Sequence, residues 1–189
     1  MRKIFPALAI LLLPTLAAIP ARASDSALFT DFKKFCVDTD ADLAKIRVVM
    51  RRANNVQQMT KPEDPRAGWM LPLRQRFLFV NAGLTYMSPK QPLPTEEVDY
   101  CSLQHQDDNA TIVAEVTAWA GMEPHLVQNS DTLKFYRYLF RKTATGNVSV
   151  EDDPAAITAA LAAGELWALG VNISNKNTFV NLQHFRAPR

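Results

Sequence analysis

The sequence lacks the motifs that mark the common classes of enzyme and metal protein. Its six glycines are scattered, so there is no glycine-rich loop to hold a phosphate group. No GxSxG motif supplies a serine nucleophile. The three histidines, His105, His125 and His184, are not spaced like zinc ligands. With these signatures missing, the sequence predicts no cofactor, no metal site and no catalytic residue.

An excess of charge of one sign is also missing. The chain has 21 Lys+Arg and 19 Asp+Glu residues. Arg2, Lys3 and Arg22 lie in the N-terminal leader, and their removal leaves 18 basic residues against 19 acidic residues. A nearly neutral domain offers no basic surface to a phosphate backbone, which argues against nucleic-acid binding. After Ser24 no apolar run approaches the roughly 20 residues that a membrane-spanning helix needs.

The N-terminus has the pattern of a secretory signal peptide. Two basic residues precede an apolar run over residues 4–19, and Ala21 and Ala23 place small residues where signal peptidase requires them. We therefore expect residues 1–23 to be removed and residues 24–189 to form a single domain. The mature protein is expected in the periplasm or outside the cell.

Cysteine is scarce, and both cysteines lie in the part expected to be exported. Cys36 and Cys101 have only one intramolecular pairing, and export brings them into an oxidising compartment. Their neighbours Phe35, Val37 and Tyr100 are apolar or aromatic rather than basic, which disfavours a reactive free thiol. We expect a Cys36–Cys101 disulfide.

Apolar periodicity predicts an α+β fold. Four segments have helical spacing, and five have the composition of strands: residues 76–87, 98–104, 133–142, 166–174 and 178–185. Residues 54–72, rich in asparagine and proline, have the composition of a connecting segment. Short turns between strands favour a mostly antiparallel sheet of about five strands, with two or three helices packed against it.

The helix ends carry recognisable capping residues. Thr39 or Asp40 is predicted to cap the second helix, and Asp153 the last one, with Pro at its first position. Gly121 and Gly164 suit the left-handed position that follows a helix.

Three aromatic and basic residues of the segment 133–142 are candidates for binding. Tyr136, Arg137 and Tyr138 would form an exposed strip of the kind found at protein-binding and sugar-binding surfaces. A strand buried beneath helices explains the same residues, with the arginine reaching solvent at its tip.

His105 is the candidate for chemistry. It lies at the end of a predicted strand, close to Asp107 and Asp108, and imidazole beside carboxylate can exchange a proton near neutral pH. A solvated loop between strand and helix accounts for the same residues.

Alternating acids near the N-terminus resemble the start of a calcium-binding loop. Asp38, Asp40 and Asp42 fit its first positions, but Leu43 and Val49 stand where such a loop needs Gly and Glu. We expect an acidic helix start instead.

One resemblance to known proteins is present. The pattern Phe-x-x-Phe-Cys-x-x-Thr, formed by Phe32, Phe35, Cys36 and Thr39, resembles the start of small uncharacterised exported proteins of proteobacteria. A second cysteine follows in that group, and the ribbon ending at His184 and Phe185 is similar too. The resemblance implies export and a cysteine pair, and it implies no activity.

Taken together, these features favour a non-enzymatic exported domain, a monomer or homodimer, that binds an envelope protein or a small ligand. The alternative is a small exported hydrolase or other enzyme that uses His105 with Asp107 or Asp108.

Overall fold

One antiparallel sheet organises the molecule. The computed structural model describes residues 26–72, 76–85, 97–106 and 111–187, so the predicted signal peptide lies outside the described residues. The strand order is β1-β2-β3-β4-β9-β8-β6-β5, with β7 also paired to β6. The strands are β1 (Gln57–Gln58), β2 (Arg66–Leu71), β3 (Arg76–Thr85), β4 (Glu97–His105), β5 (His125–Asn129), β6 (Leu133–Thr143), β7 (Gly146–Ser149), β8 (Leu166–Ser174) and β9 (Thr178–Phe185).

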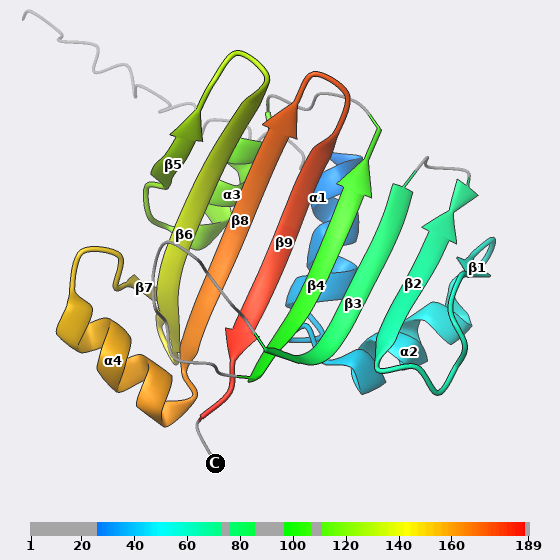
Figure 1. Ribbon diagram of the computed structural model, residues 1–189, viewed down its shortest axis with the longest axis horizontal. Coiled ribbons are helices and arrows are strands. Elements are labelled where there is room, and N and C mark those ends of the chain that lie inside the picture. Colours follow the sequence, from blue (N-terminus) through cyan, green and yellow to red (C-terminus); the bar gives the residue numbers. More distant parts are fainter. Residues whose placement is uncertain (1–25, 73–75, 86–96, 107–110, 188–189) are drawn as a thin grey trace, which may run out of the picture.

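The helices are divided between the two faces of this sheet. They are α1 (Ala27–Phe32), the π-helical turn η1 (Lys33–Val37), α2 (Leu43–Arg52), α3 (Ile112–Ala120) and α4 (Pro154–Ala163). Figure 1 shows α1, α2 and α3 behind the sheet, with α4 beside the lower ends of β6 and β8. None of the described helices is long and apolar enough to cross a membrane.

The α+β class and the antiparallel sheet are confirmed, but the sheet is larger than predicted. The structure describes nine strands and four α-helices instead of about five strands and two or three helices. One missed strand, β2, lies in residues 54–72, where a connecting segment was expected. Ala67, Trp69 and Leu71 alternate inward along it and are buried.

Burial on both faces produces two hydrophobic cores. The larger core lies between the sheet and α1, η1, α2 and α3, and includes Phe32, Leu103 and Leu169. The smaller core lies on the opposite face, where Leu139 of β6 and Leu166 of β8 pack against α4. Because successive residues of a strand point to opposite faces, β6 and β8 contribute side chains to both cores.

The predicted disulfide is present. Cys36 of η1 is bonded to Cys101 of β4, with Cα atoms 5.5 Å apart, and both residues are fully buried. The bond fixes the end of the first helical segment to the middle of the sheet.

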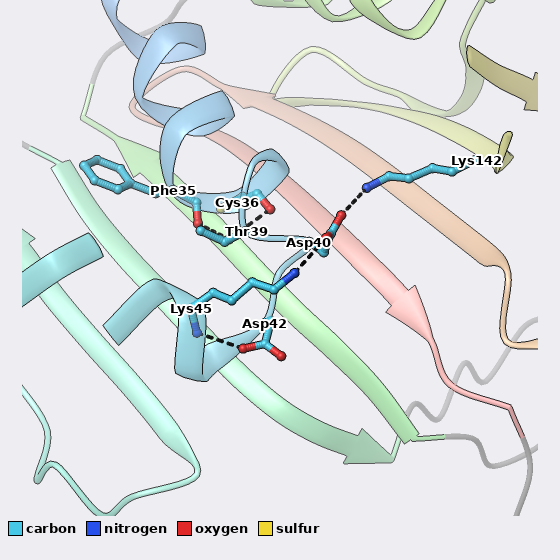
Figure 2. Close-up of polar contacts among 7 residues, drawn as sticks. All are labelled: Phe35, Cys36, Thr39, Asp40, Asp42, Lys45 and Lys142. Atoms are coloured by element: carbon cyan, nitrogen blue, oxygen red, sulfur yellow. Dashed lines mark hydrogen bonds and ion pairs between the residues drawn. The ribbon is translucent and has the colours of Figure 1, made fainter. Parts of the chain in front are cut away.

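The turn between η1 and α2 corrects the predicted helix cap. Thr39 does not cap α2, because its hydroxyl donates back to the carbonyl oxygens of Phe35 and Cys36, at 2.6 and 3.3 Å (Figure 2). Asp40 is in the left-handed region at φ 57°. The N-cap is Asp42, whose carboxylate accepts the backbone N–H of Lys45 at 2.8 Å.

The glycine caps that end α3 and α4, and the N-cap of α4, are as predicted. Gly121 and Gly164 follow these helices at φ 70° and 67°. Asp153 caps α4 by accepting the backbone N–H of Ala156 at 2.9 Å. A Cβ atom at Gly164 would lie 2.8 Å from the backbone nitrogen of Ala187, so this position excludes any side chain.

A buried ion pair joins α1 to β3. Asp31 and Arg76 are 2% and 6% exposed, and their side chains are hydrogen-bonded to each other. Arg76 also donates to the carbonyl oxygen of Ala27 at 2.8 Å. Burial of two charges is tolerated here because each is paired.

Candidate functional site

The three residues of the predicted binding strip do not share an exposed surface. Tyr138 is 1% exposed, and its hydroxyl contacts Thr117 at 2.8 Å and the carbonyl oxygen of Val113 at 3.2 Å. Tyr136 is half-buried against the same core. β6 is therefore a strand beneath helix α3, which corrects the expectation of an exposed aromatic strip.

Arg137 points to the opposite face of β6 from the two tyrosines, as strand alternation requires. Its guanidinium forms an ion pair with Glu151, with one Nε–Oε1 distance of 3.0 Å. The structure thus separates Arg137 from Tyr136 and Tyr138. Binding by Tyr136 or Arg137 alone stays a prediction.

His105 ends β4 on the sheet face covered by α1. It lies opposite Arg76 of β3 and Thr178 of β9 in the strand register, and it is half-buried. Asp107 and Asp108 lie outside the described residues, so the proton-transfer pairing also stays a prediction.

The acidic residues near α2 have internal partners. Asp40 accepts hydrogen bonds from Lys45 at 2.9 Å and Lys142 at 2.8 Å (Figure 2). Burial by itself raises the pKa of the Asp40 carboxyl, but the hydrogen bonds from the two lysines outweigh it and hold that pKa below its usual value. Within residues 26–72, 76–85, 97–106 and 111–187, no cluster of three His, Cys, Asp or Glu residues could hold a metal ion.

Lys142 connects this turn to the C-terminal strands. Its ammonium group lies 3.6 Å from the ring centroid of Trp167. Trp167 in turn stacks on His184, with ring centroids 4.1 Å apart. These contacts are those of a structural cluster, and they account for His184 without a ligand.

A cavity of about 380 Å³ lies between α2 and the β1–β2 end of the sheet. We call it the α2–β2 groove. Eight residues line it: Arg47, Met50, Arg51, Ala53, Val56, Gln58, Pro62 and Trp69. A second, more open hollow of about 330 Å³ adjoins it at Val56 and is lined by Asn55, Gln57 and Pro72 as well.

Local structure places the arginines of the groove. Arg47 and Arg51 are four residues apart on α2, so they lie on the same face of the helix one turn apart. Arg47 is anchored because its Nη2 donates to the carbonyl oxygen of Asp64 at 2.5 Å. Its Nε is buried and meets no acceptor in the part of the chain that the structure describes.

The groove carries positive charge over an apolar floor. No lining residue is acidic. Asp64 contacts Arg47 through its carbonyl oxygen, while its carboxylate accepts the backbone N–H of Arg66 at 2.8 Å. Met50 and Trp69 are 4% exposed and form the floor together with Val56. The arrangement can hold a ligand by charge at one side and by apolar contact at the other.

Sequence reasoning did not single out the groove residues. Trp69 lies within residues 54–72, which were expected to form a connecting segment. The signal that could have found the site is the arginine pair at i and i+4, with no acidic residue one turn away on the same face.

Comparison with known proteins adds no relative. The chain matches no family model, no curated protein and no solved structure.

Proposed function

We propose that the protein is an exported binding domain, rather than an enzyme, and that it holds a small ligand in the α2–β2 groove. The observation that carries this proposal is the groove itself. Its volume of about 380 Å³ lies within the range of roughly 300–1,000 Å³ that small-molecule pockets occupy. An apolar floor with a few polar groups at its side is the usual composition of such pockets.

The chemistry of the lining favours binding over catalysis. The charged groups are arginines, which keep their proton at any physiological pH and so serve poorly as general acids or bases. The remaining polar group is the amide of Gln58, which can hydrogen-bond a ligand but does not exchange protons. Such a lining orients and retains a molecule.

Export is supported by the signal-peptide pattern and by the disulfide. Disulfides persist in oxidising compartments and are rare in the cytosol. The Cys36–Cys101 bond closes a loop that contains α2, β1 and β2. The same bond thus stabilises the elements that form the groove.

Native mass spectrometry tests this proposal. The full chain is expressed with its own leader in a Gram-negative host, purified from the periplasm without reductant, and examined before and after incubation with the small-molecule fraction of the periplasm. We expect a non-covalent adduct of one ligand per chain.

Two variants locate the adduct. Ala53→Phe fills the groove and should abolish it, whereas Ala44→Phe adds the same ring at an exposed position of α2 outside the groove and should keep it. If the wild-type protein carries no adduct in either sample, or if Ala53→Phe carries it undiminished, the proposal is wrong.

A further inference from the structure

We infer that the ligand of the α2–β2 groove is an amphiphilic organic anion, with one carboxylate, sulfonate or phosphate head and an apolar body. This inference rests on the proposed function, because it assigns a chemical class to the ligand of the same groove.

The head group is assigned by Arg47 and Arg51. Guanidinium groups present donors in a planar fork that matches the oxygen atoms of a carboxylate or phosphate. Arg47 is held in place by its bond to the carbonyl oxygen of Asp64, so it need not be ordered by the ligand. Neither arginine forms an ion pair with a carboxylate of the described residues.

The charges that surround the groove do not cancel those of the arginines. On α2 the next residue, Arg52, adds a third positive charge outside the lining. Across the groove, the connection from β1 to β2 and the start of β2 carry Lys61, Glu63, Asp64 and Arg66, which are neutral in sum. The groove is therefore positive, and it favours an anion.

The body of the ligand is assigned by the floor. Val56 and Pro62 present apolar surface beside the two guanidinium groups, above Met50 and Trp69, which are almost fully buried. The adjoining hollow at Val56 extends this surface toward Pro72. An inorganic anion would leave that surface uncovered, whereas an apolar chain or ring system attached to the anionic head fills it.

A pair of fluorescent probes tests the assignment. 8-Anilinonaphthalene-1-sulfonate carries a sulfonate, and N-phenyl-1-naphthylamine has the same rings without it. Titration of the purified mature protein with each probe gives two dissociation constants. We expect the sulfonate to bind one site per chain at least ten-fold more tightly than the neutral probe, as about one charge-assisted hydrogen bond predicts.

Matched arginine variants identify the groups that recognise the anion. Arg51 is substituted rather than Arg47, because Arg47 donates to the carbonyl oxygen of Asp64. The Arg51 side chain makes no hydrogen bond to another described residue, so Arg51→Gln breaks none. This variant should weaken sulfonate binding about ten-fold and leave the neutral probe unchanged. Arg52→Gln removes an equal charge from the same helix end, with the same effect on the helix dipole, but outside the groove. It should leave both constants unchanged.

The outcomes separate the class of ligand from the existence of the site. If the two probes bind equally and Ala53→Phe abolishes the binding of both, the inference that the ligand is an anion is wrong. The groove then remains a binding site for neutral apolar molecules. Equal effects of Arg51→Gln and Arg52→Gln also overturn it, because they reveal a general effect of charge. Binding of both probes that Ala53→Phe leaves unchanged places them elsewhere, and then the groove and the proposed function fail together.

Discussion

Loss of the Cys36–Cys101 disulfide is expected to lower the free energy of unfolding by about 4 kcal/mol. The two cysteines are 65 residues apart in the sequence, and closure of a loop of this length restricts the unfolded chain by about that amount in the chain-entropy model. The loop contains α2, β1, β2 and β3, so its release in the unfolded state frees a large part of the chain. Both cysteines are fully buried, so their replacement also removes packing contacts.

Urea unfolding followed by circular dichroism measures this effect in oxidised wild type, reduced wild type and the variant C36A/C101A. With a slope of about 2 kcal/mol per molar urea, the midpoint should fall by about 2 M in the variant. Reduced wild type keeps the sulfur atoms and loses only the bond, so a similar fall there assigns the effect to the covalent link. If reduced wild type unfolds within about 0.5 M of the oxidised protein, the loop-closure reasoning is refuted.

Three further predictions concern single positions. D31A leaves the Arg76 guanidinium buried without its carboxylate, so it should lower the free energy of unfolding by about 3–5 kcal/mol. D31A/R76M removes the unpaired charge as well and should cost clearly less. Equal losses for the two variants in urea unfolding would contradict this. G164A and G121A both place a Cβ atom at positive φ, at a cost of about 1 kcal/mol each. Only the Cβ added at position 164 would also collide with backbone. Thermal unfolding should therefore show a larger loss of stability for G164A, and equal losses would exclude the collision. The folded-state pKa of Asp40 lies below its unfolded value of about 3.9, so the stability from its ionised form is present above about pH 4 and lost as pH falls through the folded pKa. D40N should therefore be less stable than wild type at pH 6, and the gap in urea unfolding should narrow as the pH falls below about 4. A gap that is constant with pH would refute this.

Much of the sheet could be predicted because its central strands are long and bounded by clear turns. The segments 166–174 and 178–185 were predicted with the bounds that β8 and β9 have. The sequence could not reveal β5 in the same way, because all five of its residues are exposed and so show no alternation. β7 has four residues, too few for a pattern. Edge strands of this kind are fixed by hydrogen bonds to β6 rather than by their own apolar residues.

The helix caps show where local chemistry is ambiguous. Thr39, Asp40 and Asp42 are all competent N-caps by residue type. Asp42 is the N-cap because the Thr39 hydroxyl already donates to the carbonyl oxygen of Phe35 in η1. Asp40 and Ala41 are in the left-handed region, so α2 begins only after them. The two left-handed residues follow the π-helical turn whose Cys36 is bonded to β4, and residue type alone does not reveal that backbone geometry.

The exposed binding strip was wrongly predicted, and the groove was missed, for the same physical reason. The exposure of a side chain is set by contacts between segments that are distant in the sequence. Tyr138 alternates with Arg137 as the pattern requires, but α3 covers one face of β6 and the side chains around Leu139 cover the other. The groove needs α2 to lie beside Trp69 of β2, and no local pattern encodes that approach. The arginine pair on α2 could nevertheless have been recognised in the sequence as an unusual feature, because like charges at i and i+4 destabilise a helix. An anion between Arg47 and Arg51 would relieve that repulsion, so the feature that costs the free protein stability is the one that the inferred ligand would satisfy.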